Sequence, residues 1–259
     1  MERRFWESFV SIPPGASQIG DEHRRGAPGA RKVRATRTTY GYRLLSTPVT
    51  QGMWEEIVGG ADVLLQERAL GDAGTEYSRR FVSLGVNRPM TCITYEEAEQ
   101  FCKLASGQGR DVRLPTEVEW EHACRAGSRS KYHWGDDSAA YARFAWTCDS
   151  FPGGVTSIIL PDVAQRQSNA WDVHDMVGLV SEWVRGRYRM KGGPYVDEES
   201  AFGSATDLVD WTPPEDGDMA MVRGCPILLS AGAATPGLSA LRGLSTAVPE
   251  LGFRVAWYD

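Results

Sequence analysis

Two copies of one helix-start signal constrain the fold of this 259-residue chain more than any other sequence feature. The segments TYEE at 94–97 and TEVE at 116–119 each place a threonine three residues before a glutamate. In such a capping box the threonine hydroxyl accepts a hydrogen bond from the glutamate N–H, and the glutamate carboxylate accepts one from the threonine N–H. Both segments are therefore predicted to start helices.

The residues after the two boxes have the spacing of helices with one apolar face. The expected buried residues are Ala98, Phe101, Cys102 and Ala105 after the first box, and Trp120, Ala123 and Cys124 after the second. The second of these helices is predicted to end at Gly127. A further helix is predicted after Thr50, which would serve as its N-cap, and is expected to end at Gly59-Gly60. Its apolar side would carry Met53, Trp54, Ile57 and Val58.

Beyond residue 132 the helical pattern gives way to short apolar pieces between Gly, Asp, Asn and Pro. Strands are expected at 9–12, at Trp183-Val184 and within 252–257. The 28 glycines and 14 prolines are typical of a turn-rich chain rather than a helical bundle. With 259 residues, 42% of them apolar, the chain is expected to form a single α+β domain over residues 1–259.

Charge and hydropathy argue against two classes of partner. The net charge is −6 and the pI is about 5.4, whereas a general nucleic-acid binder is normally basic. No apolar run reaches membrane-spanning length, and residues 1–12 show no signal-peptide pattern. We therefore expect a cytoplasmic protein with no nucleic-acid or membrane partner. The basic stretch 23–37 and the acidic stretch 197–218 are each interpreted as a solvated loop.

The cysteines and histidines show no metal-site spacing. The five cysteines are Cys92, Cys102, Cys124, Cys148 and Cys225. Their number is odd and no CxxC occurs, so neither a disulfide framework nor a zinc site is expected. Most are expected to be buried, reduced thiols. The four histidines are dispersed along the chain.

Several segments resemble, in order, those of one enzyme family. They are FVSIPPG at 9–15, PVT at 48–50, RLPTEVEWE at 113–121, YHWG at 132–135, DMVGLVSEW at 175–183, VRG at 222–224 and GFR at 252–254. Together they resemble the formylglycine-generating enzyme (sulfatase-modifying factor) family. The resemblance implies a C-type-lectin-like α+β fold with a small mixed sheet, a few helices and much irregular structure. We expect Thr116, Glu119, Trp120, Trp134 and Glu182 in these motifs to be structural rather than catalytic.

The family's chemistry needs residues that this chain lacks. The resemblance implies a copper ion held by two cysteine thiolates just after the Arg-Gly segment, because soft thiolates suit Cu(I). Here Arg223-Gly224 is followed by Cys225, and no further cysteine occurs before the C-terminus. The resemblance also implies a calcium site, where Leu179 replaces an expected asparagine, although Asn169 and Asp172 keep oxygens for a residual site. We therefore expect no cofactor and a binding protein, or pseudoenzyme, rather than an oxidase.

Residues 225–250 have an unusual composition. This stretch, CPILLSAGAATPGLSALRGLSTAVPE, contains no Lys, Gln, Met, Trp, Asn, Asp, His, Phe or Tyr. Most of its residues are codable when the adenines of asparagine codons are replaced. That repertoire resembles the variable proteins of bacterial diversity-generating retroelements, many of which use this fold. Glu250 does not fit the repertoire and would be a fixed position. Ordinary divergence in a decayed enzyme is the alternative explanation.

The same stretch supplies the predicted ligand-binding surface. Its members are Ile227, Leu228, Leu229, Leu238, Leu241, Arg242, Leu244 and Val248. If exposed together, the apolar side chains would form a patch suited to a protein ligand, which Arg242 could orient. Leu251 is expected to be buried framework. Two alternatives stay open: a diverged copper- or iron-dependent oxidoreductase, and a rigid pseudoenzyme that acts through the basic stretch at 24–37.

Overall fold

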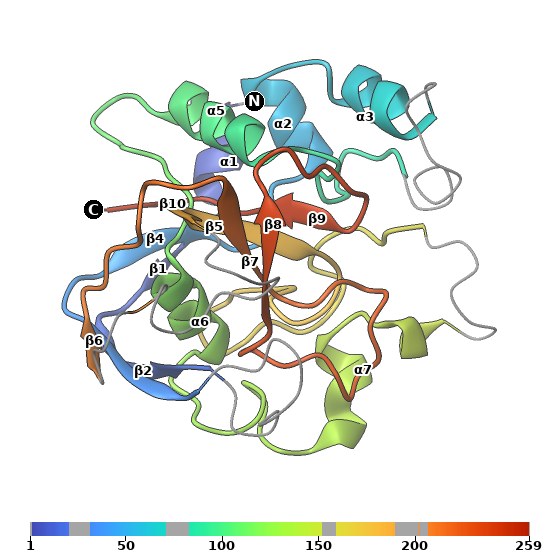
Figure 1. The fold of residues 1–259 in the computed structure, drawn as a ribbon. Coiled ribbons are helices and arrows are strands. Elements are labelled where there is room, and N and C mark those ends of the chain that lie inside the picture. Colours follow the sequence, from blue (N-terminus) through green and yellow to red (C-terminus); the bar gives the residue numbers. More distant parts are fainter. Residues whose placement is uncertain are drawn as a thin grey trace.

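The computed structural model describes residues 2–20, 32–70, 83–151, 159–189, 202 and 207–258. Helices and strands are short and are separated by irregular segments (Figure 1). In chain order they are α1 (Glu2–Glu7), β1 (Phe9–Ile12), β2 (Gly15–Ile19), β3 (Arg34–Thr38), β4 (Tyr42–Leu45), α2 (Gln51–Ile57), α3 (Ala61–Leu70), α5 (Tyr95–Ala105), α6 (Glu117–Arg125), η2 (Ser138–Ala140), α7 (Tyr141–Phe144), η3 (Cys148–Ser150), β5 (Ser181–Tyr188), β6 (Asp207–Val209), β7 (Met219–Arg223), β8 (Ser239–Gly243), β9 (Leu251–Phe253) and β10 (Ala256–Trp257).

These strands form three small sheets. The four-stranded sheet has the order β8-β7-β5-β9 and is mixed, because β9 runs parallel to β5 while the other neighbours are antiparallel. The other two sheets have the orders β1-β4-β10 and β2-β3-β6. Within the described part of the chain, no helix combines the length and hydropathy that crossing a bilayer requires. The α+β architecture with a small mixed sheet agrees with the sequence-based expectation.

All three predicted helices are present with the predicted caps. Thr50 Oγ1 accepts the N–H of Met53 at 3.2 Å at the start of α2. At α6, Thr116 Oγ1 accepts the N–H of Glu119 at 3.2 Å, and Glu119 Oε2 accepts the N–H of Thr116 at 2.8 Å. The same reciprocal pair opens α5. Helix α6 ends where Ala126 adopts a left-handed conformation with φ 45°, one residue before the predicted Gly127.

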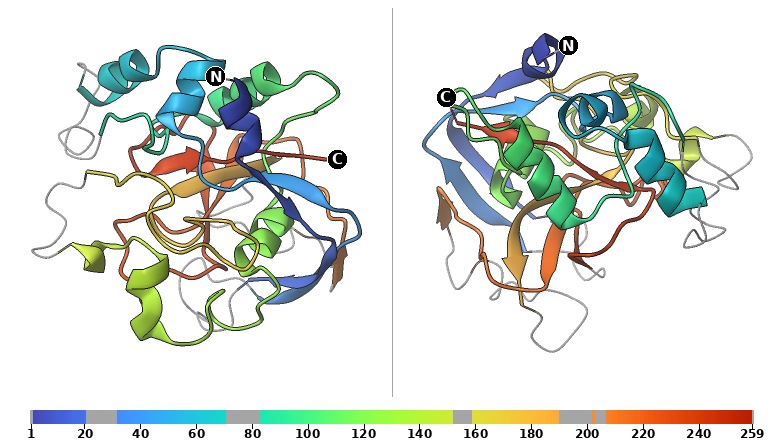
Figure 2. Two further views of the ribbon diagram at one scale, coloured as in Figure 1. Left: turned by 180° about the vertical axis from the view of Figure 1, so that it is seen from behind. Right: turned by 90° about the horizontal axis from the view of Figure 1, so that it is seen from above.

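The four-stranded sheet separates two apolar clusters. Side chains alternate between the two faces of a strand. Accordingly Trp183 packs in one cluster and its neighbour Val184 in the other, and on β7 Val222 and Met221 are divided in the same way. Figures 1 and 2 show α2, α3 and α5 on one side of this sheet and α6 on the other. Helix α6 contacts β5 and β7, and aromatic rings of α2 and α5 contact the ring of Phe253 on β9.

Buried ion pairs join the sequence motifs to one another. Glu182 on β5 accepts the indole N–H of Trp120 from α6 at 2.8 Å and two hydrogen bonds from Arg254, at 2.7 and 2.8 Å. Arg113 forms a second two-pronged pair with Glu119, at 2.8 and 2.7 Å. These motif residues are buried and use their polar groups on each other. Their contacts agree with the structural role expected for them, except that Trp134 is only half-buried.

Two loop predictions need correction. Arg34 and Arg37 belong to strand β3, which pairs antiparallel with β2 and parallel with β6. Strand β6 in turn lies inside the acidic stretch that we interpreted as a loop. Hydrogen bonds between distant segments explain both errors, because nothing in the local sequence signals them. Residues 32 and 33 of the predicted basic loop have no regular structure, as expected, whereas its residues 23–31 and the acidic residues Asp197, Glu198 and Glu199 lie outside the described residues.

Candidate ligand-binding pocket

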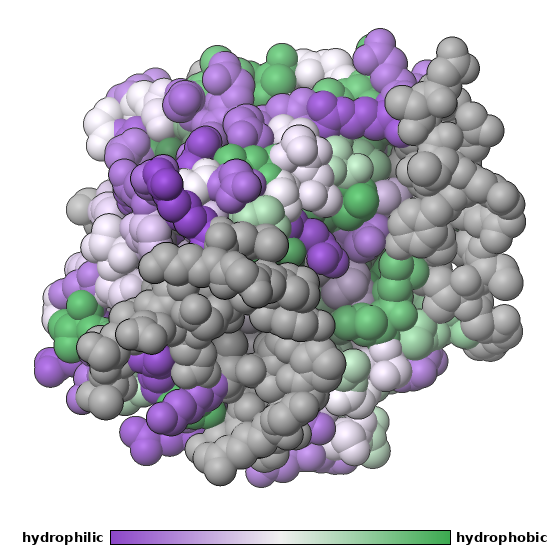
Figure 3. All heavy atoms as spheres, viewed as in Figure 1, coloured by the Kyte–Doolittle hydropathy of each residue, from purple (hydrophilic) through white to green (hydrophobic). Residues whose placement is uncertain are grey.

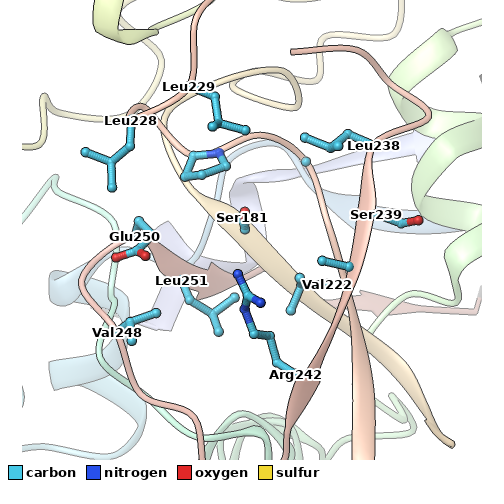
Figure 4. Close-up of a pocket in the computed structure, with 13 residues that line it drawn as sticks. Ser181, Val222, Leu228, Leu229, Leu238, Ser239, Arg242, Val248, Glu250 and Leu251 are labelled. Carbon is cyan, nitrogen blue, oxygen red and sulfur yellow. The ribbon is translucent and has the colours of Figure 1, made fainter. Parts of the chain in front are cut away.

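A pocket of about 290 Å³ lies on the α5 side of the four-stranded sheet, beside β8. Strand residues from β5, β7, β8 and β9 form its floor, and the loops at 226–229 and 248–250 form its walls (Figure 4). The lining residues are Ser181, Val222, Gly224, Pro226, Leu228, Leu229, Leu238, Ser239, Ala240, Arg242, Val248, Glu250 and Leu251. On the face shown in Figure 3, apolar residues gather right of centre. A pocket of this volume has room for a small ligand or one side chain of a partner.

The pairing of β8 with β7 decides which of its side chains reach the pocket. Arg242 lies opposite Ala220, and Leu241 lies opposite Met221. Paired residues point to the same face of a sheet, and successive residues point to opposite faces. Arg242 therefore shares the pocket face with Val222, while Leu241 packs on the other face against the cluster that contains Met221.

Five of the eight predicted ligand-binding residues line this pocket. They are Leu228, Leu229, Leu238, Arg242 and Val248. Leu229 is 36% exposed and Arg242 is also exposed, while the other three are half-buried. The chain thus brings together residues from both ends of the stretch 225–250. As expected, Leu251 is a buried residue of the sheet beneath them.

The other three predicted residues lie elsewhere. Ile227 is 1% exposed and packs beneath the pocket wall with Leu179, so its side chain offers no surface to a ligand. Leu241 is half-buried on the opposite face of β8. Leu244 is half-buried against the α5 cluster, and its carbonyl accepts the N–H of Tyr95. These three residues therefore do not line the pocket, and β8 and the turn after it place Leu241 and Leu244 away from it.

Arg242 and Glu250 are the charged residues of the pocket lining. Figure 4 shows the Arg242 guanidinium pointing toward the middle of the pocket, while Glu250 lies on the far side near Leu228 and Val248. Glu250 Oε2 is buried and has no hydrogen-bond partner. No ion pair joins the two side chains, both of which lie in the described part of the chain. The pocket lining therefore contains one cationic donor group and one carboxylate within apolar walls.

Sequence reasoning missed Ser181, Val222 and Pro226 as parts of this site. Val222 and Ser181 belong to motif segments that signal the fold, and only the pairing of β5 with β7 and β9 places them under the predicted surface. Glu250 was noted as a position outside the variable repertoire. Its place in the pocket could not be derived from that observation, since it depends on the turn at 248–250.

The cysteines do not assemble the copper site that the family resemblance implies. Cys225 is buried, its thiol donates to the Pro226 carbonyl at 3.6 Å, and it does not line the pocket. Cys148 is half-buried with its thiol next to Asp149. Burial raises the pKa of the Cys92 and Cys124 thiols to about 12, which keeps them protonated. In the described ranges, no group of three or more His, Cys, Asp and Glu side chains is arranged to hold a metal ion.

Two positions of the implied calcium site, Asn169 and Leu179, are used for contacts within the fold. Asn169 Oδ1 accepts the N–H groups of Trp171 and Val173, at 3.0 and 3.1 Å. Its amide nitrogen donates to the carbonyls of Ala123 and Cys124. Leu179 is fully buried in an apolar cluster. The donor atoms that a hard cation needs are therefore committed or missing at these two positions.

Comparison with known proteins agrees with the resemblance found in the sequence. The family model of the sulfatase-modifying factor enzyme 1-like domain matches residues 2–258. The chain is 33% identical over 105 residues to the formylglycine-generating enzyme of Mycobacterium tuberculosis, which covers 37% of this chain and 32% of that protein. It is 29% identical over 131 residues to the inactive C-alpha-formylglycine-generating enzyme 2 of Bos taurus, covering 45% and 41%. The match thus spans less than half the length of either relative.

A solved structure extends the likeness to the whole fold. Treponema denticola variable protein 1 superposes with a TM-score of 0.71 at 18% identity, covering 97% of this chain and 95% of that one. At this identity the likeness shows a shared fold. The C-type-lectin-like α+β fold expected from the sequence motifs is therefore confirmed.

Proposed function

The chain belongs to the sulfatase-modifying factor enzyme 1-like domain family, and from that premise we propose that it is a non-catalytic binding protein whose pocket beside β8 receives a protein ligand. The observation that most directly supports this proposal is that five of the eight predicted ligand-binding residues line one pocket. The pocket floor is a sheet fixed by two apolar clusters. Such a rigid floor favours binding, because little conformational entropy is lost when a ligand docks.

The apolar walls support a protein ligand. Leu228, Leu229, Leu238 and Val248 all keep some surface in contact with water. Fully burying a side chain of this size favours association by about 1.5–3 kcal/mol, before the cost of losing translational and rotational freedom. Because these residues already bury part of their surface, the gain at each is smaller, and several must act together. A partner side chain inserted between them would contact both loops at once.

The composition of 225–250 supports diversification of this surface by a retroelement. The stretch that supplies most of the pocket lining is the one whose residues fit adenine replacement in asparagine codons. The test is genomic: a neighbouring reverse transcriptase and an adenine-rich near-copy of codons 223–254 are expected. A gene neighbourhood without either would leave ordinary divergence as the explanation.

A direct test of the pocket uses an apolar fluorescent dye such as ANS, which brightens on apolar surfaces. We expect the folded protein to bind the dye, and Leu229→Asp to weaken binding by placing a charge in the wall. Leu104→Asp is the matched control, because Leu104 is exposed on α5 and does not line the pocket. Equal dye binding by both variants would contradict the proposed role of the pocket.

The alternative is a diverged copper- or iron-dependent oxidoreductase. The similarity of the chain to enzymes such as the formylglycine-generating enzyme of Mycobacterium tuberculosis supports this alternative. The missing second cysteine after Arg223-Gly224 argues against formylglycine formation. We expect no mass change when the protein is incubated with Cu(I), dioxygen and a cysteine-containing sulfatase peptide. Turnover that Cys225→Ser abolishes would overturn the proposal, as would stoichiometric copper or iron after aerobic purification.

A further inference from the structure

The two charged groups of the pocket point to the chemistry of its ligand. Glu250 is a half-buried residue of the pocket wall, and its oxygen Oε2 has no hydrogen-bond partner among the described residues. An ionised carboxylate can only accept hydrogen bonds. A ligand that brings an N–H donor to the part of this carboxylate that faces the pocket therefore gains a charge-assisted hydrogen bond.

Arg242 supplies the opposite polarity on the other side of the pocket. It is exposed and its guanidinium points toward the middle, so it can receive a carboxylate or another acceptor. Since Arg242 and Glu250 form no ion pair with each other, binding need not break an existing contact between them. Leu251 lies between them, and Leu228 and Val248 line the pocket beside Glu250 (Figure 4).

We infer that the pocket selects an apolar side chain of a protein partner that is flanked by a basic group on the Glu250 side and an acidic group on the Arg242 side. The inference rests on the proposed binding function and adds charge selection to it. A partner with the apolar residue alone would fill the pocket but bring no donor to the Glu250 carboxylate. Charge complementarity of this kind governs specificity more than total affinity.

Three derivatives of leucine separate the charges of the ligand from its apolar part. Leucinamide carries the ammonium group only, N-acetylleucine the carboxylate only, and N-acetylleucinamide neither. Each is titrated into the protein at about pH 6.5, below the α-amino pKa of about 8, and followed by NMR shifts of the pocket residues. We expect leucinamide and N-acetylleucine each to bind at least about tenfold more tightly than N-acetylleucinamide, in line with a charge-assisted hydrogen bond.

Variants that remove one charge at a time show whether Glu250 causes the preference for the ammonium group and Arg242 the preference for the carboxylate. Glu250→Gln is expected to abolish the advantage of leucinamide and leave that of N-acetylleucine unchanged, and Arg242→Gln to do the reverse. Glu67→Gln and Arg129→Gln are the controls, because both side chains are exposed and neither lines the pocket. Thermal melts of each variant establish that it is folded before titration.

The outcomes distinguish this inference from the proposed function. If all three compounds shift the pocket residues with equal affinity, the pocket binds apolar groups and charge selection is wrong. If the ammonium preference survives Glu250→Gln, the assignment of that residue is wrong. If none of the compounds shifts any pocket residue, the proposed binding function itself is contradicted.

Discussion

At the scale of single residues, Glu182 is the point where three sequence motifs meet. Its carboxylate is fully buried and accepts hydrogen bonds from Trp120 and Arg254. We expect Arg254→Met to lower the free energy of unfolding by about 3–5 kcal/mol, because it leaves a buried carboxylate without its counter-charge. Urea unfolding followed by tryptophan fluorescence measures the loss.

The double variant Arg254→Met/Glu182→Gln tests the reason for this loss. Glutamine removes the unpaired charge and keeps a carbonyl oxygen for the Trp120 indole N–H. We therefore expect the double variant to be more stable than Arg254→Met alone. Its loss of unfolding free energy should be smaller than the sum of the losses in Arg254→Met and Glu182→Gln. Additive losses would show that packing of the Arg254 side chain, and not its charge, determines stability.

A second residue links stability to pH. The His133 ring packs against Trp134 and Phe144, and burial lowers its pKa from 6.5 to about 4. Between these two values the unfolded chain holds a proton on this ring that the folded protein lacks, so stability falls as pH falls from 6.5 toward 4. His133→Gln cannot take up this proton. We expect the stability difference between about pH 7 and pH 5 to be smaller in the variant, as measured by urea unfolding at both pH values.

At the scale of elements, adjacent residues of strand β8 have different roles because they point to opposite faces of the sheet. Leu241 packs against the cluster around α6, whereas Arg242 faces the pocket. We expect Leu241→Asn to lower the melting temperature, because it exposes the cluster to a polar group. Arg242→Gln is expected to leave the melting temperature within about 2 °C, since a surface change away from the core alters stability by about 0.5 kcal/mol or less. Similar losses in both variants would contradict the strand register.

The elements differ in how far the sequence predicts them. The starts of α5 and α6 were predicted to the residue, because a capping box is a contact between residues three apart. Strands β3 (RATRT) and β8 (SALRG) were missed, because neither shows apolar alternation and both are formed by pairing with distant strands. The pocket follows the same rule. Five of its thirteen lining residues were predicted as ligand-binding. The division of the predicted residues between faces depends on β7, which the local sequence of 225–250 does not contain.

At the scale of the whole molecule, the shared sheet couples the two main apolar clusters. Trp120 lies in the α6 cluster and Phe101 in the α5 cluster, and adjacent residues of β5 and β7 enter both. We expect Trp120→Ala and Phe101→Ala each to lower stability by about 3–5 kcal/mol. Each variant should still show one cooperative transition by fluorescence and by circular dichroism. Two separate transitions in either variant would show that the clusters unfold independently.

The residues that line the pocket come almost entirely from one part of the chain. Apart from Ser181, every residue of its lining falls between 222 and 251, while helices α5 and α6 with their capping boxes lie earlier in the chain. Most of the pocket is thus encoded by one short, contiguous segment of the gene. Within that segment Ile227 is buried, and Leu241 and Leu244 pack against the two clusters. A mutant library that varies the pocket-lining codons of 226–250 and keeps these three residues would alter the pocket while retaining the packing of the scaffold.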